Sequence, residues 1–333
     1  MKFFRKQLLG SGAYGSVYAL SDERWVVKQF LIDSASAYQN YKKETHFLKS
    51  LQSLQYFDPV SGLWQWICPQ IKHTERKGKL GIHVMERMTA SLHMLGQLQA
   101  KKCGLNMNCD LVYSEMQLRQ VANLCEALDK WGIVHGDLKR RNILFSWTSG
   151  SVIINKSGVF TTPLSLRVVD FGFSGIRPSN ATKEKLLTRI CKADSIGYPA
   201  SIENLEKNIN GALPNWILQN LNRWQLFYDL LIVRNIYIER NNVLHPITPY
   251  ELQSIFQVPS KVIDRFWRFF PGKLQNEFEW NARRRGTRLM VRSSDRSQHA
   301  GKVAAVERTL SNLVDGTRRT SAGREKKAQT ARR

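Results

Sequence analysis

The segment Ile133–Leu144 places a carboxylate, an ammonium group and an amide at fixed offsets between two apolar stretches. Asp137 could accept the proton of an attacking hydroxyl, Lys139 could neutralise charge on a moving phosphoryl group, and Asn142 could hold a metal ion. Phosphoryl transfer needs these three groups together. The segment therefore predicts a phosphotransferase loop, provided that the rest of the chain supplies a nucleotide site.

A glycine-rich stretch near the N-terminus could supply the contact to phosphates. Gly10, Gly12, Gly15 and Val17 fit the pattern G-x-G-x-x-G-x-V, in which the backbone can approach phosphates because no Cβ intervenes. An ordinary hairpin turn explains a lone pattern of this kind about as well. A dinucleotide-binding fold would place a helix directly after the glycines, whereas two short strand patterns follow here. That order favours a flap over ATP.

Two further groups complete a nucleotide and metal site. Lys28 ends the second of these strands, and Glu44 lies within residues 38–54, where the apolar spacing predicts a helix. If this helix packed on the strand, Glu44 would pair with Lys28 and aim it at the α- and β-phosphates. Asp170 follows a strand pattern at 166–169 and precedes a Phe-Gly pair, a position that suits a Mg²⁺ ligand.

Taken in order along the chain, these motifs resemble the eukaryotic-type protein kinases from about Leu8 to Gly172. The resemblance implies a Ser/Thr protein kinase that uses ATP and Mg²⁺ and acts on protein substrates. For the nucleotide, the resemblance implies an ATP flap at Gly10, Gly12, Gly15 and Val17, an ion pair of Lys28 with Glu44, a gatekeeper at Met85, and an adenine-binding hinge at Glu86, Arg87 and Met88. For the reaction, it implies a catalytic base at Asp137 and a phosphate-facing lysine at Lys139. It also implies metal ligands at Asn142 and Asp170.

Several positions depart from the kinase pattern. Gly136 stands where many kinases have an Arg that pairs with an activation-loop phosphate, which implies activity that does not await loop phosphorylation. The two metal-ligand positions are about twice as far apart as usual, and residues 146–163 between them are interpreted as a hairpin insertion. No Ala-Pro-Glu follows, and Ile196–Glu203 is only a weak substitute. Asn222 replaces the usual Asp of the central helix of the second lobe.

The expected fold class is α+β, a two-lobed protein-kinase-like fold. Residues 1–88 are expected to form a small, mostly antiparallel sheet with one helix, and residues 89–280 a shortened, mostly helical second lobe. Strands are expected near 5–10, 15–20, 24–30, 65–73 and 80–86. Helices are expected over 111–131 and within 214–238 and 249–270.

Residues 281–333 differ in composition from the rest of the chain. The 333 residues carry a formal charge of +23, and this segment alone has 15 Lys and Arg against 4 Asp and Glu, a net charge of +11. It has no aromatic residue and no sustained apolar period, so a disordered basic tail is expected. A solubilising tail, a nuclear import signal and nonspecific nucleic-acid contact all remain open. Basic or nucleic-acid-associated proteins are accordingly one expected class of substrate.

Several features favour an intracellular protein. The five cysteines form no C-x-x-C pair, the N-terminus does not fit a signal peptide, and no apolar run is long enough for a membrane span. A short second lobe followed by a basic tail is most similar to the kinases of large DNA viruses. That resemblance implies the host nucleus or cytoplasm, with packaging in the virion as a further location.

Two other functions compete with the protein-kinase interpretation. Small-molecule phosphotransferases of the aminoglycoside-kinase type share the His-Gly-Asp-Leu run, but they more often have His in place of Lys139, and here Asp170 is followed by an intact Phe-Gly. The other alternative is an inactive pseudokinase that binds nucleic acid through its tail. The full set of ATP and metal residues argues against it.

Overall fold

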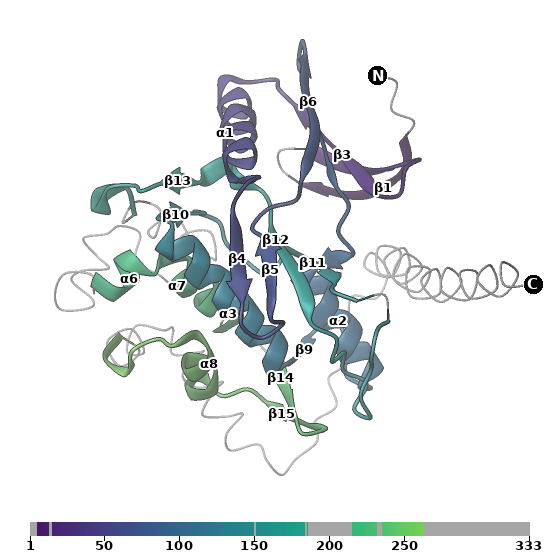
Figure 1. The fold of residues 1–333 in the computed structure, drawn as a ribbon, viewed down its shortest axis with the longest axis vertical. Coiled ribbons are helices and arrows are strands. Elements are labelled where there is room, and N and C mark those ends of the chain that lie inside the picture. Colours follow the sequence, from purple (N-terminus) through teal and green to yellow (C-terminus); the bar gives the residue numbers. More distant parts are fainter. Residues whose placement is uncertain are drawn as a thin grey trace, which may run out of the picture.

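The computed structural model describes residues 5–12, 15–149, 151–183, 185, 215–231 and 235–262. Its N-terminal part is a five-stranded antiparallel sheet in the order β1-β2-β3-β7-β6 (Figure 1). The strands are β1 (Arg5–Gly12), β2 (Gly15–Leu20), β3 (Trp25–Leu31), β6 (Ile71–Lys77) and β7 (Leu80–Glu86). The antiparallel sheet predicted from the sequence is confirmed. The fourth of its strands, expected at 65–73, begins only at Ile71.

Helix α1 (Ala35–Leu51) packs on one face of this sheet. It begins three residues before the expected start at Tyr38, because the Ser34 hydroxyl accepts a hydrogen bond from Ala37 N at 3.1 Å and caps the helix. Tyr41 donates from its hydroxyl to Glu75 O at 2.9 Å, which ties the helix to β6. The face of α1 that carries Glu44 therefore points towards β3.

An unpredicted hairpin connects α1 to β6. It consists of β4 (Gln55–Asp58) and β5 (Leu63–Trp66), which run from below α1 over α3 (Figure 1). The carboxylate of Asp58 is fully buried and accepts hydrogen bonds from Gln120 Nε2 at 2.7 Å and Asn123 Nδ2 at 3.0 Å. The hairpin is thus fastened to α3 through a buried anion whose lone pairs are occupied by amide donors.

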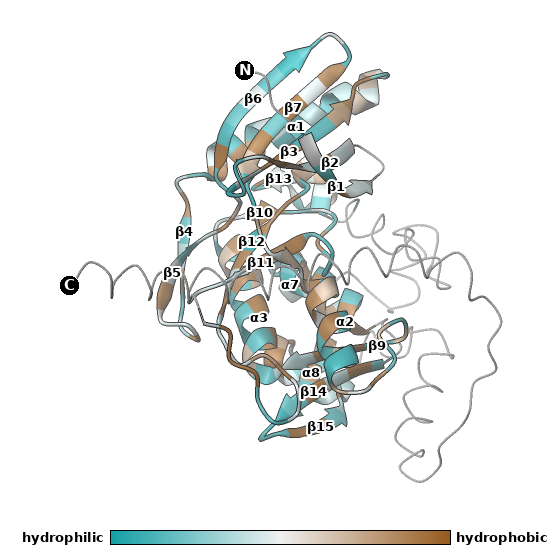
Figure 2. Cartoon of the chain, turned by 90° about the vertical axis from the view of Figure 1, so that its right-hand side faces the viewer, coloured by the Kyte–Doolittle hydropathy of each residue, from teal (hydrophilic) through white to brown (hydrophobic). Residues whose placement is uncertain are grey.

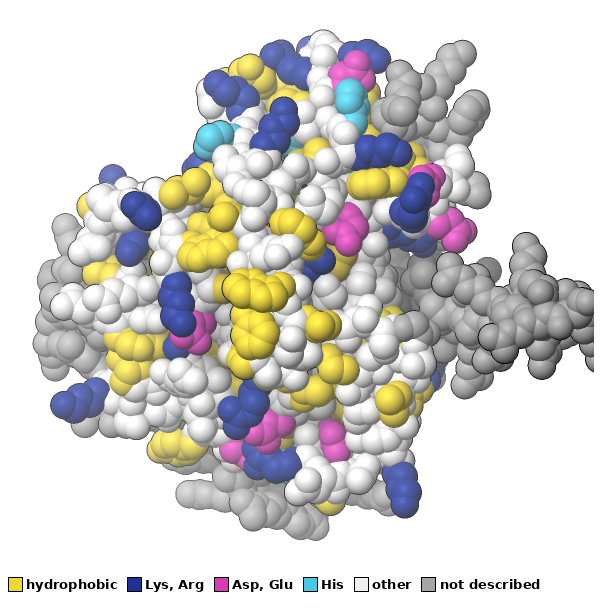
Figure 3. Space-filling model, viewed as in Figure 1, with side chains coloured by type: hydrophobic (Ala, Val, Ile, Leu, Met, Phe, Trp, Pro, Cys, Tyr) yellow, Lys and Arg dark blue, Asp and Glu magenta, His cyan; other side chains and the backbone are white. Residues whose placement is uncertain are grey.

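The outer side of the same hairpin is apolar. Phe57 and Trp64 pair across it with their ring centroids 5.8 Å apart, and 50% and 67% of their surfaces are exposed. Figure 3 shows hydrophobic side chains gathered over this part of the molecule. The hairpin therefore has one polar side buried on α3 and one aromatic side turned outward.

The remaining described part combines helices with more strands than the sequence predicted. Its helices are α2 (Leu92–Lys102), α3 (Glu115–Lys130), α6 (Asn215–Gln219), α7 (Leu221–Leu231) and α8 (Pro249–Phe256). Its strands are β8 (Ala90–Ser91), β9 (Asp110–Ser114), β10 (Ile133–Val134), β11 (Ile143–Trp147), β12 (Leu164–Val168), β13 (Gly175–Ile176), β14 (Asn235–Arg240) and β15 (Val243–Pro246). Hydrophobic residues line α2 and α3 and the strands near them (Figure 2).

The helix expected over residues 111–131 is wrong in part. Residues 111–114 form β9, because they pair in parallel with β14 and because Ser114 starts α3 with a capping box to Gln117. The helices expected within 214–238 appear as α6 and α7, and residues 235–238 at the end of that range belong to the partner strand β14. The helix expected within 249–270 appears as α8, and the residues after 262 lie outside the described residues.

The hairpin insertion predicted at 146–163 is present. Strands β11 and β12 flank it and pair antiparallel from Ile143 with Val168 to Trp147 with Leu164. Within the insertion, Phe160 N donates to Gln99 Oε1 at 2.9 Å, and its carbonyl accepts from Gln117 Nε2 at 3.0 Å. Buried amides of α2 and α3 therefore hold the inserted segment.

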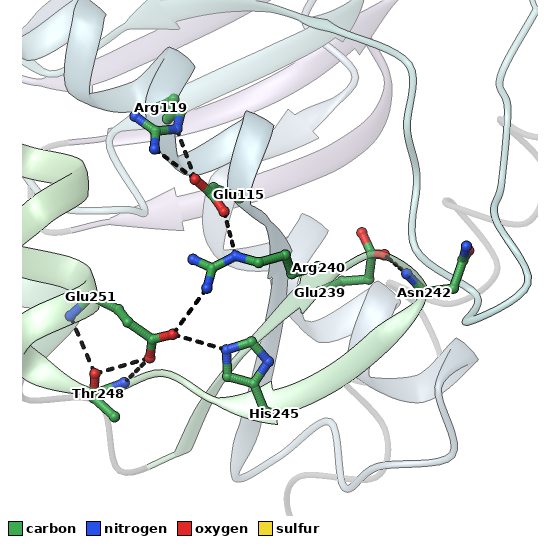
Figure 4. Close-up of polar contacts among 8 residues, drawn as sticks. All are labelled: Glu115, Arg119, Glu239, Arg240, Asn242, His245, Thr248 and Glu251. Atoms are coloured by element: carbon green, nitrogen blue, oxygen red, sulfur yellow. Dashed lines mark hydrogen bonds and ion pairs between the residues drawn. The ribbon is translucent and has the colours of Figure 1, made fainter.

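A surface network joins β14 and β15 to both neighbouring helices (Figure 4). Arg240 Nε lies 2.6 Å from Glu115 Oε2 on α3, and its Nη1 lies 3.3 Å from Glu251 Oε1 on α8. Glu251 also contacts His245 Nε2 at 3.0 Å and caps its own helix by accepting from Thr248 N.

In the described ranges no helix is long and apolar enough to cross a bilayer.

Candidate active site

Lys28 stands between two carboxylates. Its Nζ lies 2.7 and 2.9 Å from the Oε1 and Oε2 atoms of Glu44 and 3.6 Å from Asp170 Oδ1. Burial lowers the pKa of Lys28, but attraction to Glu44 and Asp170 outweighs this effect, so the pKa is raised and the amine stays charged. The pairing of Lys28 with Glu44 predicted from the sequence is present.

The register of the sheet explains why these groups meet. Lys28 pairs with His83 of β7, and side chains of β3 alternate between the two faces of the sheet. Val26, Lys28 and Phe30 consequently face α1, where Glu44 is 2% exposed. The ring of Phe30 lies edge-on to Tyr41 of α1, with the centroids 5.3 Å apart. The strand and the helix are thus packed on both sides of the ion pair.

Asp137, Lys139 and Asn142 form a second group. Lys139 Nζ lies 2.9 Å from Asp137 Oδ2, and Asn142 Nδ2 donates to Asp137 O at 2.8 Å and to Oδ2 at 3.3 Å. The Oδ1 atom of Asp137 has no donor among the described residues. One carboxylate oxygen is therefore held in place, while the other is left to accept a proton.

His135 joins this group to the strand that leads to Asp170. Its Nδ1 accepts from Asp137 N at 3.3 Å, so its Nε2 carries the proton and donates to Val169 O at 2.9 Å. Burial lowers the pKa of His135, which keeps the ring neutral in this arrangement. Val169 N also donates to Asn142 O at 3.0 Å. The proposed base and both proposed metal ligands are thus fixed through one short backbone segment.

Asp170 adopts a left-handed backbone conformation with φ 69° and ψ 56°. Such a conformation is unfavourable for a residue with a Cβ, and it occurs more often at functional sites than elsewhere. The following Phe171 is fully buried and lies parallel to Phe47 of α1, with ring centroids 6.0 Å apart. This packing holds α1 next to Asp170, which keeps Glu44 near Lys28.

Asn142 and Asp170 could hold a magnesium ion together with phosphate oxygens. They stand at the same end of the β11–β12 pair, one directly before Ile143 and the other two residues after Val168. Asn142 uses its Nδ2 on Asp137, and its Oδ1 has no donor among the described residues. A carboxylate and an amide oxygen are suitable ligands, since Mg²⁺ usually binds one or two carboxylates and completes its shell with phosphates and water.

Helix α7 supports the Asp137 loop from below, and this support was missed from the sequence. Its side chains Asn222, Gln225 and Asp229 occur at spacings of three and four and so share one helix face. They accept hydrogen bonds from three loop amides, which are His135 N at 2.9 Å, Leu138 N at 2.8 Å and Arg140 N at 2.9 Å. The available signal was a row of polar residues on an otherwise apolar helix.

The predicted glycines lie on β1 and β2 and differ in their surroundings. A Cβ on Gly15 would collide with the carbonyl oxygen of Gln29, so this glycine is required by the close approach of β2 to β3. A Cβ on Gly10 would meet nothing within 4 Å. Gly12 pairs with Gly15, and Val17 pairs with Lys28. Residues 13 and 14 lie outside the described residues.

The predicted hinge lies after β7. The Glu86 carboxylate accepts from Gln70 N at 3.2 Å and faces the buried Arg167 Nε at 3.7 Å. Met85 and Met88 are buried. The backbone N–H of Met88 has no acceptor among the described residues, as an adenine-binding position requires. Of the other predicted features, Ile196–Glu203 and the tail 281–333 lie outside the described residues.

Comparison with solved structures gives distant likenesses of fold. A crystal structure of the kinase domain of PF14_0431 matches with a TM-score of 0.43 and 14% sequence identity, covering 83% of this chain and 94% of that chain. No protein-family model matches the sequence. No curated protein matches it either.

Proposed function

We propose that the protein transfers the γ-phosphoryl group of ATP to Ser or Thr hydroxyls of other proteins. The observation that carries this proposal is the linked pair of polar groups. Lys28, charged between Glu44 and Asp170, is joined through Val169 to the loop that holds Asp137. Such an arrangement supplies a cation for phosphates, a metal-ligand position and a base within one connected structure.

Each side chain would have a separate task. The free Oδ1 of Asp137 would accept the proton as the hydroxyl oxygen attacks the γ-phosphorus, and ADP would leave with the electrons of the broken P–O bond. Lys139 holds Oδ2 of Asp137 and could also neutralise charge on the transferred group. Lys28 would orient the α- and β-phosphates. Magnesium, held by Asn142 and Asp170, would supply charge neutralisation on the phosphates.

The proposal has a direct test. The full chain is incubated with labelled ATP, Mg²⁺, mixed proteins and small amino-sugars, and the labelled products are separated. Label on protein Ser or Thr supports the proposal. Label on the amino-sugars alone would favour a small-molecule phosphotransferase, and no label on any acceptor would favour an inactive nucleotide-binding protein. The Asp137→Asn variant in parallel excludes a contaminating kinase.

The partners and the cellular location of the protein are also proposals. Nonspecific nucleic-acid contact through residues 281–333 rests on their charge alone, and these residues lie outside the described residues. An intracellular location, in the host nucleus or cytoplasm and in the virion for a viral protein, is likewise proposed from sequence features.

A further inference from the structure

The turn Lys139–Asn142 lies directly against the proposed catalytic base. It is closed by a hydrogen bond from Asn142 N to Lys139 O at 2.8 Å. Both of its ends contact Asp137, through Lys139 Nζ and through Asn142 Nδ2. The backbone of the two middle residues therefore lies next to the residue that would deprotonate an accepting hydroxyl.

The two middle residues are arginines with different surroundings. Arg140 folds back onto α7, where its Nη1 lies 2.6 Å from Asp229 Oδ1 and its charge is neutralised. Arg141 is exposed, and in the described ranges its side chain has neither an ion pair nor a hydrogen bond. The turn consequently presents one uncompensated cation to an approaching acceptor.

The neighbouring helix adds no negative charge. The first turn of α2 packs on the arginine turn, with His93 N donating to Arg140 O at 3.2 Å. Burial, with further repulsion from Arg140 and Arg141, lowers the pKa of His93 to about 3, so this ring is neutral. Between Glu86 and Asp110, a stretch that includes all of α2, the chain has no Asp or Glu. A basic peptide would find no carboxylate partner along this segment.

We infer that the acceptor is a peptide with an anionic side chain, a carboxylate or a phosphate, close to the accepting Ser or Thr, and that Arg141 recognises it. This inference rests on the proposed function and narrows its substrate class. It differs from the expectation of basic substrates, which was drawn from overall composition and not from the charges at the site. A lysine-rich peptide would bring like charges next to Arg141, whereas an acidic one would form an exposed ion pair.

The test compares three peptides with one Ser each. The residues on both sides of the Ser are Asp in the first peptide, phosphoserine in the second and Lys in the third. Phosphoserine has no free hydroxyl, so each peptide has a single accepting Ser. The full chain is assayed with ATP and Mg²⁺ at low salt, and kcat/KM is measured for each peptide. We expect both anionic peptides to exceed the Lys peptide by roughly fivefold, the upper range for one exposed ion pair. Comparing the Asp and phosphoserine peptides tells carboxylate recognition from phosphate recognition.

Charge substitutions at Arg141 assign the effect. Arg141→Gln should abolish the preference and Arg141→Glu should reverse it, whereas Lys79→Glu, which changes the net charge equally at the distant β6–β7 turn, should leave it unchanged. The ratio of the kcat/KM values for two peptides, measured on one enzyme preparation, does not depend on the fraction of the enzyme that is folded. Salt near 1 M should remove the preference by screening.

Two kinds of result overturn the inference. If the wild-type chain labels mixed proteins but prefers the Lys peptide, or if Arg141→Glu keeps the wild-type ratio, the inference fails and the proposed function stands. If the wild-type chain labels no protein and no peptide, the proposed function fails and the inference fails with it.

Discussion

The carboxylate of Asp129 on α3 accepts the side-chain amide of Asn222 on α7 at 2.7 Å and also accepts Asn222 N at 3.0 Å. Asn222 uses its Oδ1 to accept His135 N and its Nδ2 also to donate to Ile133 O. Asn222 stands where the kinase pattern has Asp. The carboxyl group is thus present in this structure, but it belongs to the neighbouring helix α3.

Exchanging the two residues tests this relationship. Asp129→Ala should lower the free energy of unfolding by about 1–3 kcal/mol, because buried donors of Asn222 and Arg223 lose their acceptor. Asn222→Asp should also destabilise, because it places two buried carboxylates together. The double variant Asp129→Asn, Asn222→Asp should recover part of the loss. Denaturant unfolding measures each effect, and strictly additive losses would contradict the pairing.

Asp129 should also make stability depend on pH. Burial, opposed by hydrogen bonds from Asn222 and Arg223, raises its pKa from 3.8 to about 7. The folded state therefore binds the proton more tightly than the unfolded state between these values, so the free energy of unfolding should fall as pH rises from about 4 to about 7. Asp129→Asn should flatten this slope, whereas Asp22→Asn, at an exposed surface turn, should not.

Substitutions of the two acidic residues of the proposed site should have different effects on catalysis and on ATP binding. Asp137→Asn should lower kcat for phosphoryl transfer by at least about a hundredfold and leave Mg²⁺-dependent ATP binding intact, because the base does not hold the metal. Asp170→Asn should weaken metal-dependent ATP binding as well. Calorimetric titration with ATP, with and without Mg²⁺, separates the two. Full activity of Asp137→Asn would contradict the assignment of the base.

The glycines provide a matched pair. Gly15→Ala should destabilise the protein by more than about 1 kcal/mol, because the new methyl group would collide with the Gln29 carbonyl. Gly10→Ala should leave thermal stability nearly unchanged, since nothing lies within 4 Å of its Cβ position, but should raise the KM for ATP. Equal stability losses in the two variants would contradict this distinction.

Gly136 has a backbone reason to be glycine, since its φ is 79°. It also lacks the guanidinium that would pair with a phosphate on the activation loop. We expect protein treated with phosphatase to retain most of its activity on an added substrate. A loss of more than about tenfold, equivalent to about 1.4 kcal/mol of barrier, would mean that another basic residue reads a loop phosphate.

The basic tail should act through its charge. Removing residues 281–333 takes away 15 Lys and Arg. The slope of the logarithm of nucleic-acid affinity against the logarithm of salt concentration should then become shallower by several units. The rate on a short peptide should not change. An unchanged salt slope would leave the segment as a solubilising or import sequence.

The site was predictable where the pattern was local. Lys28 and Glu44 lie in elements that each show their own periodicity, so their pairing followed from packing a helix on a strand. Asp170 was recognised because it follows a strand pattern, but its approach to Lys28 was not predicted. Gln225 and Asp229 were missed because their partners are backbone amides of a loop about ninety residues away. Asp129 was missed because its partners, Asn222 and Arg223, lie on α7 at a similar separation along the chain. Composition and spacing do not reveal such pairings.

The limits of the elements were less predictable. The apolar run at 111–113 fits a helix as well as a strand, and only the parallel partner β14, more than a hundred residues later, decides it. The hairpin β4–β5 was missed for a similar reason, since the donors that bury Asp58 come from α3. Local propensity does not include such distant partners.

The same hairpin bears on how the chain reaches its folded state. Asp58 meets Gln120 and Asn123 only after loops of more than sixty residues close, and Gln65 bonds Leu166 N across about a hundred residues. Loop closure of this length costs entropy before any contact compensates for it, so assembly should be slow and cooperative. A fragment ending near residue 88 would keep the sheet sequence but would lack every one of these partners.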